Sequence, residues 1–278
     1  MTTPKYSIVT TCKGRLHNLK RTLPAFLGQP NTEVIVVDYD CPDGTAAYVA
    51  EVHPAARLVS VTDQPGFNLP HARNLGAAQA RGEFLVFLDA DVVVSEQFMA
   101  HIDGKLEPGS YALFSPTVQN SLRGSCVIAR KHFTALGGYD ELLAGYESED
   151  LDMYMRLGLL GARKVFLDPA VVVEVIEQDL AERTRFRGDS DLKRPFLRGQ
   201  LYMSAKEMVM RADGTAVLGL PLRRKIYEEV NRNLESLYSG TKDFSLEVSL
   251  PDKYKRGLLQ EWEFSRAIVV KARKKKPL

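Results

Sequence analysis

The feature that most constrains this chain is a regular exchange, between residues 6 and 91, of short apolar runs with helix-like segments. The runs are rich in β-branched residues and apolar throughout, as is typical of parallel strands buried on both faces. We expect strands over residues 7–11, 33–37, 58–62 and 84–88. Helices are expected over residues 16–27, 46–52 and 70–80, and Pro24 is expected to interrupt the first of them. The pattern predicts an α/β fold: a Rossmann-like, mostly parallel sheet with flanking helices.

The pattern becomes mixed after residue 91. Ser95 is expected to cap a short helix, followed by strands over residues 111–114 and 125–129, an amphipathic helix over 149–160, and strands over 164–167 and 171–176. The remainder is rich in charge and in helix-forming residues, notably over 222–237 and 253–272. We therefore predict an α/β domain over residues 1–194 and a helical C-terminal extension over residues 195–278, packed on that core.

Composition narrows the possible partners. With 278 residues, of which 45% are hydrophobic, the chain can bury a full core. Its 37 Lys and Arg nearly balance its 35 Asp and Glu, which argues against a dedicated nucleic-acid binder. Cys12, Cys41 and Cys126 are odd in number and widely spaced, which fits neither a disulfide framework nor a zinc site. A reducing cytosol is the expected compartment.

The ends of the chain bear on membrane contact. The N-terminus lacks the apolar region of a signal peptide, and no apolar stretch reaches the roughly 18 to 20 residues that span a bilayer. The basic run over residues 271–276 is expected to be a solvated terminus, with binding to anionic headgroups or to nucleic acid as the alternative. The sequence thus predicts a cytoplasmic protein, with association at the inner face of a membrane left open.

Distinctive polar residues follow three of the predicted strands, over residues 10–13, 38–40 and 89–91. In open α/β sheets, ligands bind beyond the carboxyl ends of the strands, where the loops carry the chemistry. We expect these segments to converge on one site.

The pair of acids in Asp89-Ala90-Asp91 follows a strongly apolar run, so both carboxylates are expected to emerge at the edge of the sheet. Mg²⁺ and Mn²⁺ favour such oxygen ligands and commonly bridge a carboxylate to substrate phosphates. A metal there would stabilise the charge that grows on a departing diphosphate. An Asp-x-Asp tripeptide is common by chance, and its position after a buried strand makes it informative.

Several ordered motifs extend this reading. The sequence over residues 6–15, 33–38, 72–76 and 82–91 resembles family-two glycosyltransferases of the GT-A fold. Residues 137–141 and 145–152 are similar to the C-terminal Glu-Asp motif of inverting galactosyltransferases. The order and spacing match over about residues 5 to 190, within the domain predicted over residues 1–194.

The resemblance implies roles by position on the donor side. Residues after the first strand would contact the nucleotide base and phosphates, one acid would lie near the uracil or ribose, and an arginine would flank the donor. Within the acid pair, Asp91 is the expected direct metal ligand, and Asp89 is the expected partner of the ribose or of a group that surrounds the metal. The donor-binding residues are then Thr11, Cys12, Lys13, Arg15, Asp38, Arg73, Asp89 and Asp91.

On the acceptor side, the resemblance implies that Asp150 is the general base of an inverting transfer from a UDP-sugar to a carbohydrate or glycolipid hydroxyl. Glu149 would accept hydrogen bonds from acceptor hydroxyls, and Tyr146 would offer a face to a sugar ring. Both acids open a predicted helix, where the helix dipole favours negative charge whatever their function.

The sequence departs from the family pattern at two places. Many relatives carry a second acid directly after the position of Asp38, where this chain has Tyr39. Metal-dependent relatives supply a histidine beyond the Glu-Asp motif, where this chain offers only the acids Glu174, Glu177 and Asp179. Two alternatives therefore stay open: a nucleotidyltransferase, and a non-catalytic carbohydrate- or nucleotide-binding module on the same fold.

Overall fold

The computed structural model describes residues 3–115, 122–187, 192–239, 241, 243–251 and 265–272. The chain divides into two compact units, the first built from Met1–Gly145 and Glu149–Ser190 and the second from Tyr146–Ser148 and Asp191–Leu278. Among the described residues, no helix has both the length and the apolar character needed to cross a bilayer. Most of the basic C-terminal run, residues 273–276, lies outside the described part of the chain.

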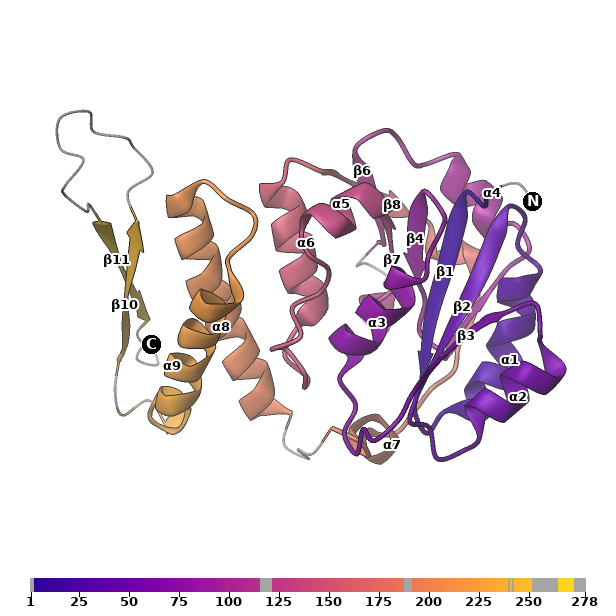
Figure 1. The fold of residues 1–278 in the computed structure, drawn as a ribbon, viewed down its shortest axis with the longest axis horizontal. Helices are drawn as coiled ribbons and strands as arrows, with labels where there is room; N and C mark the ends of the chain where they lie inside the picture. Colours follow the sequence, from indigo (N-terminus) through magenta and orange to yellow (C-terminus); the bar gives the residue numbers. More distant parts are fainter. Residues whose placement is uncertain are drawn as a thin grey trace. The chain divides into compact units, whose positions relative to one another are not determined.

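A seven-stranded sheet organises the first unit (Figure 1). Its strand order is β3-β2-β1-β4-β7-β6-β8. The first four strands are parallel, β7 is antiparallel to both of its neighbours, and β8 is parallel to β6. The strands are β1 (Tyr6–Cys12), β2 (Thr32–Tyr39), β3 (Arg57–Val61), β4 (Phe84–Phe87), β6 (Ser110–Phe114), β7 (Cys126–Ala129) and β8 (Arg163–Leu167). The expected mostly parallel sheet is confirmed.

Helices cover both faces of this sheet, with α1 and α2 on one side and α3 on the other (Figure 1). Leu19, Leu23 and Phe26 are completely buried along one stripe of α1 and pack with Ile8 and Val34 of the sheet. Their spacing is that of a helix with one apolar face. The helices are α1 (Leu16–Leu27), α2 (Thr45–Val52), α3 (Leu69–Ala78), α4 (Phe98–Asp103), α5 (Arg130–Ala135), α6 (Glu149–Leu159) and α7 (Leu180–Thr184), with a 3-10 turn, η2 (Pro169–Val171).

Two local expectations were wrong. Pro24 does not interrupt α1, because the helix continues past it and the Gly28 N–H donates to the Pro24 carbonyl at 3.1 Å. Ser95 does not cap α4, whose first residue follows Gln97. The Ser95 carbonyl instead accepts hydrogen bonds from Gln29 Nε2 at 2.9 Å and from the Phe98 N–H at 3.1 Å. The Gln29 side chain also accepts the Met99 N–H at 3.2 Å, so the first N–H groups of α4 are satisfied by the Ser95 carbonyl and by a side chain from outside the helix.

A separate antiparallel pair, β5 (Val92–Val94) with β9 (Val172–Val175), follows the acidic edge of the sheet. Its register carries the chain back beside the acid pair, since the Ile176 N–H donates to the Asp91 carbonyl at 2.8 Å. Residues after β9 therefore lie next to the predicted metal ligand.

The second unit contains α8 (Lys193–Asp213) and α9 (Leu220–Ser239), followed by the antiparallel strands β10 (Phe244–Pro251) and β11 (Ser265–Ala272). The helix expected over residues 253–272 is wrong over 265–272, and residues 252–264 lie outside the described part. In β10, Phe244, Leu246 and Val248 are buried in alternation, so this unit is not entirely helical as predicted.

Candidate functional site

The carboxyl ends of β1, β2 and β4 meet at one edge of the sheet, as the sequence predicted. Cys12 at the end of β1 pairs in register with Asp38 of β2, and Val9 pairs with Phe87 of β4. The loops that carry residues 13–15, 40–43 and 89–91 therefore emerge together. This edge is where ligands of parallel α/β sheets bind.

A buried arginine holds the first acid of the pair. Arg73 projects from α3, is 2% exposed, and its Nη2 donates to Asp89 Oδ1 at 2.8 Å and to the Gly124 carbonyl at 3.1 Å. Its guanidinium lies over the rings of Phe87 and Tyr139, at 5.9 and 5.3 Å from their centroids. The guanidinium is buried and the Asp89 side chain is 27% exposed, so solvent screens this pair less than it screens a pair on the open surface.

The same guanidinium reaches the acidic start of α6. Arg73 Nη1 lies 3.9 Å from Glu149 Oε1, while Nη2 of the same side chain binds Asp89. Two predicted motifs, distant in sequence, are thus brought to either side of one cation. This convergence is the central geometric result for the candidate site.

Asp91 occupies a different electrostatic setting. Its Oδ2 lies 3.7 Å from Arg15 Nη1, and its side chain is 18% exposed. Burial, with repulsion from Asp89, raises the pKa of Asp91 to about 6. A carboxylate pair strained in this way suits a divalent cation, whose charge would favour the ionised form.

The oxygen donors present fit Mg²⁺ or Mn²⁺ in part. Among the described residues, no group of three or more His, Cys, Asp or Glu side chains is arranged to hold a metal by itself. Asp91 and Asp89 offer carboxylate oxygens at this edge, and Mg²⁺ is commonly held by one or two carboxylates together with substrate phosphates.

Two of the acids that could supply a further metal ligand, Glu174 and Asp179, have other partners. Glu174 pairs with Arg21 at 2.6 Å, and Asp179 caps α7 by accepting from the Glu182 N–H at 2.8 Å. Gln178, which the sequence reasoning passed over, follows the contact between Ile176 and Asp91, and its Nε2 is buried with no hydrogen-bond partner in the described structure. An unsatisfied buried amide of this kind calls for an explanation such as a bound ligand.

Asp150 is 8% exposed in the first turn of α6. Burial and the adjacent charge of Glu149 raise the pKa of Asp150 to about 7, against the opposing effect of the Leu151 N–H, which donates to Oδ1 at 2.8 Å, and of Arg73. A carboxyl group that titrates near neutrality is matched to accepting a proton from a hydroxyl.

The third acid of this turn is structural. Asp152 is fully buried and accepts from Arg156 Nε at 2.8 Å. Arg156 in turn donates to the carbonyls of Leu136 and Gly138, at 3.0 and 2.9 Å. The pair ties α6 to the turn that follows α5, so of the three acids only Glu149 and Asp150 remain for chemistry.

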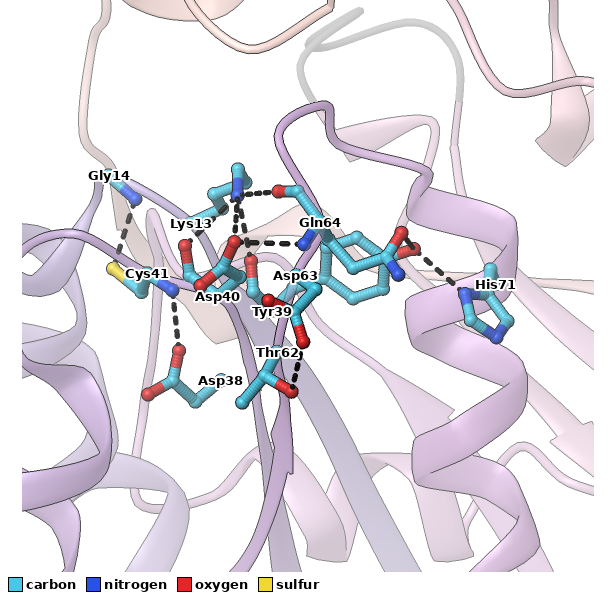
Figure 2. A network of polar contacts seen from close by, with 10 residues as sticks. All are labelled: Lys13, Gly14, Asp38, Tyr39, Asp40, Cys41, Thr62, Asp63, Gln64 and His71. Atoms are coloured by element: carbon cyan, nitrogen blue, oxygen red, sulfur yellow. Dashed lines mark hydrogen bonds and ion pairs between the residues drawn. The ribbon is translucent and has the colours of Figure 1, made fainter.

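Lys13 and Asp38 have backbone partners (Figure 2). Lys13 Nζ donates to the carbonyls of Tyr39, Asp40 and Gln64, at 3.1, 3.0 and 2.5 Å, so all three of its protons are used. The two oxygens of Asp38 accept from the Cys41 and Ala46 N–H groups, both at 2.8 Å. Both residues shape the loops of the donor edge in this structure.

The remaining residues of the predicted site lie in different parts of the structure. Thr11 and Cys12 are buried at the end of β1, and Cys12 joins the core cluster that contains α1. Tyr39 replaces the expected acid, and its hydroxyl contacts His71 Nδ1 at 2.8 Å. Tyr146 belongs, with residues 147 and 148, to the second unit.

Phe186 also lies at this edge of the sheet, although no sequence motif indicates it. Its carbonyl accepts from the Phe67 N–H at 2.7 Å, and its ring lies 5.2 Å from Lys13 Nζ. A Cβ on Gly14 would lie 2.2 Å from that ring, and Gly14 has a φ of +70°. Glycine is therefore required there twice over, for conformation and for space.

The mostly parallel sheet with its flanking helices has the GT-A class of fold, and solved structures of that class match the chain. A mannosyltransferase, PcManGT from Pyrobaculum calidifontis in complex with GDP-Man and Mn²⁺, aligns with a TM-score of 0.54 at 18% identity, covering 86% of this chain and 83% of that one. S. aureus TarS 1-349 in complex with UDP-GlcNAc aligns with a TM-score of 0.57 at 17% identity, covering 86% and 74%. At these identities the likeness establishes the fold alone.

The sequence comparison gives the family. The model of glycosyl transferase family 2 matches residues 7–154, more than half of the chain. This protein therefore belongs to glycosyl transferase family 2. It is also 27% identical over 212 residues to the O-antigen biosynthesis protein RfbC of Myxococcus xanthus, an alignment that covers 59% of this chain and 16% of that relative.

Proposed function

We propose that this protein transfers a sugar, with inversion, from a nucleoside diphosphate sugar to a hydroxyl of a carbohydrate or glycolipid. The observation that carries the proposal is the single guanidinium of Arg73 between Asp89 and Glu149. It joins the acid pair suited to a metal-bound diphosphate to the helix start that holds Asp150. Family membership and the nucleotide sugars in the matching structures support the same reaction.

On the donor side, Asp91 and Asp89 would hold Mn²⁺ or Mg²⁺, which supplies Lewis-acid stabilisation of the leaving diphosphate. Arg15, beside Asp91, adds a positive charge at the same edge. The loops fixed by Lys13 and Asp38 would shape the site of the base, for which we propose uracil. The buried amide of Gln178 is a further candidate to contact the donor.

On the acceptor side, Asp150 would take the proton of the attacking hydroxyl as the new glycosidic bond forms. Inversion requires this base opposite the leaving group, and a pKa of about 7 keeps much of the carboxyl ionised at neutral pH. Glu149 would accept hydrogen bonds from acceptor hydroxyls, and Tyr146 would face a sugar ring. The similarity to RfbC supports a growing glycan as acceptor.

Turnover of nucleotide sugars tests the proposal directly. We expect the purified protein to release UDP from at least one UDP-sugar in the presence of Mn²⁺, and to stop when EDTA removes the metal. GDP-mannose belongs in the same panel because PcManGT was solved with it. Consumption of a nucleoside triphosphate with release of pyrophosphate would instead identify a nucleotidyltransferase. Binding without any turnover would identify a non-catalytic module.

Asp150→Asn tests the base within that assay. We expect transfer to fall by about a hundredfold or more, the usual contribution of a general base, while donor affinity measured by calorimetry stays close to that of the parent. Glu51→Gln makes the same chemical change at an exposed position on α2 and serves as the matched control. Full activity in Asp150→Asn would remove the base assignment.

A further inference from the structure

Two free thiols lie side by side at the proposed donor edge. Cys12 Sγ and Cys41 Sγ are 4.0 Å apart, although the residues are separated by 29 positions in the chain. Cys12 is fully buried, and Cys41 is half-buried. The remaining cysteine, Cys126, is buried on β7 with its Sγ 3.6 Å from the Tyr139 hydroxyl.

The fold sets this pair firmly. Cys12 is the last residue of β1 and is in register with Asp38 of β2. The Asp38 carboxylate accepts the Cys41 N–H (Figure 2) and also the Ala46 N–H, and so closes the turn that brings Cys41 back towards β1. The approach of the two sulfurs therefore follows from the pairing of the strands and from one capped turn.

The surroundings of the two sulfurs differ in a way that matters for reactivity. Cys41 Sγ accepts the Gly14 N–H at 3.1 Å and faces the thiol of Cys12, whereas Cys12 Sγ accepts the Thr45 hydroxyl at 3.2 Å within the core. The hydrogen bond from Cys12 lowers the pKa of Cys41 to about 5, and the same contact, with burial, raises the pKa of Cys12. The surroundings thus favour the ionised form of the more accessible sulfur and the protonated form of the buried one.

We propose that Cys12 and Cys41 form a reversible disulfide when a hydroperoxide reaches this edge. The Cys41 thiolate attacks the terminal peroxide oxygen, the O–O bond breaks, and the departing alkoxide or hydroxide takes up a proton. Cys41 becomes a sulfenic acid. The Cys12 sulfur then attacks the Cys41 sulfur, the S–O bond breaks, and water leaves with the Cys12 proton. A dithiol returns both residues to thiols.

Closing the disulfide would change the donor edge. The two sulfurs must approach from 4.0 Å to about 2.05 Å. Cys12 is held in the sheet by its pairing with β2, so we expect Cys41 to make the larger movement and its contact with the Gly14 N–H to change. Asp43, two residues further, accepts the Leu16 N–H at 3.3 Å and lines an open pocket of about 410 Å³ together with Gly14. We therefore expect the disulfide to weaken nucleotide binding, an expectation that rests on the proposed function.

Mass spectrometry tests the disulfide without reference to any substrate. One equivalent of hydrogen peroxide is expected to remove two hydrogens from the intact protein and to yield, without reductant, a peptide pair joined through Cys12 and Cys41. Dithiothreitol should reverse both changes. Cys126→Ser, the matched control, should oxidise in the same way, and Cys41→Ser should give no cross-link. Conversion of Cys41 to sulfinic acid alone, or a cross-link through Cys126, would overturn the proposal.

Alkylation of the wild-type protein keeps the test independent of how the variants fold. Iodoacetamide at about pH 6.5 should label Cys41 at least about tenfold faster than Cys12 or Cys126, because only its thiolate is populated at that pH. Prior treatment with peroxide should block this labelling, and dithiothreitol should restore it. Equal labelling of all three cysteines would contradict the proposed order of attack.

Titration with UDP separates the consequence from the proposed function. The reduced protein should bind UDP, and the oxidised protein should bind it about fivefold or more weakly, the scale of a typical coupling between two sites. Equal affinity of the two forms would show that the disulfide does not regulate the donor edge. A reduced protein that binds no UDP would count against the proposed donor while leaving the disulfide result standing.

Discussion

Asp150 is buried, whereas the proposed reaction requires its carboxylate to be charged. Burial disfavours the charged form. Its pKa of about 7 lies above the ordinary value of 3.8 that we expect in the unfolded chain. Between these two pH values the folded protein holds a proton that the unfolded chain has released. Stability therefore falls as the pH rises through this window, and the whole penalty is present above about pH 7.

Asp150→Asn should remove that penalty. The gain in melting temperature over the parent is expected to be close to zero near pH 4 and to grow up to about pH 8, since each pKa unit is worth about 1.4 kcal/mol and each kcal/mol roughly 2–4 °C. Calorimetry across this range measures it, with Glu51→Gln as the control that should show no such slope. A constant difference at every pH would mean that Asp150 is not buried as a charge.

Arg73 is a positioning residue whose loss should be felt at both acids. Arg73→Met leaves Asp89 and Glu149 without their shared cation, and we expect it to cost about 3 kcal/mol of folding stability. Arg81→Met, which breaks the exposed pair with Glu33, should cost at most about 1 kcal/mol.

Arg73 also lowers the pKa of Asp150, so its removal should move the pH dependence of catalysis. The acidic limb of the rate profile is expected to shift to higher pH in Arg73→Met, on whatever activity remains. Arg73→Lys keeps a charge but cannot bridge two acids as a planar fork does, so it should show a smaller shift. A limb that stays in place in both variants would argue against electrostatic coupling to the base.

The convergence of the segments that follow β1, β2 and β4 could be predicted from the sequence, because the ends of parallel strands share an edge of the sheet whatever their spacing in the chain. The contacts of Arg73 with Asp89 and Glu149 were not predicted and are visible only in the structure. The partners of Lys13 come from three backbone carbonyls in two other loops, and backbone groups leave no mark in a sequence. The approach of Cys12 to Cys41 was missed for a similar reason, since it follows from strand register and one turn.

At the scale of elements, continuous apolar runs identified the parallel strands well, because a strand buried on both faces needs no polar positions. The strand β11 was mistaken for a helix. Its run Ile268-Val269-Val270 is short and lies beside charged residues that favour helices, and its pairing with β10 is a tertiary contact. Pairing with β10 outweighs the local helix propensity of this segment.

The closeness of α3 to the sheet is a testable property of that element. A Cβ at Gly76 would lie 2.5 Å from Val9 Cγ1 and 2.9 Å from Val37 Cγ2, both in the packed core. We expect Gly76→Ala to destabilise the protein by about 1–3 kcal/mol in urea denaturation, because overpacking outweighs the gain in helix propensity.

Gly158 provides the matched control on α6. A Cβ there meets nothing within 4 Å, so Gly158→Ala should stabilise the protein by about 0.5–1 kcal/mol. Stabilisation by both substitutions would show that α3 can move away from β1 and β2, and that its contact with the sheet does not fix the position of Arg73.

At the scale of the whole molecule, the chain passes between its two units more often than a simple division at residue 194 would require. Residues 146–148 belong to the second unit, although the chain on both sides of them belongs to the first. Glu147 anchors this short segment. It is 1% exposed, accepts from Arg198 Nε at 2.8 Å, and binds the Tyr227 hydroxyl through both oxygens at 3.1 and 3.0 Å.

We therefore expect Glu147→Gln to destabilise the second unit strongly, although it only replaces a carboxylate by an amide. The amide keeps the shape but loses the charge that balances Arg198, and removal of one partner from a buried ion pair costs about 3 kcal/mol. The control is Glu207→Gln on α8, where the pair with Arg211 is partly exposed and should be worth at most about 1 kcal/mol. Thermal unfolding followed by calorimetry distinguishes the two. Equal small losses would show that residues 146–148 are not held through Glu147, and that the crossing of the chain has another anchor.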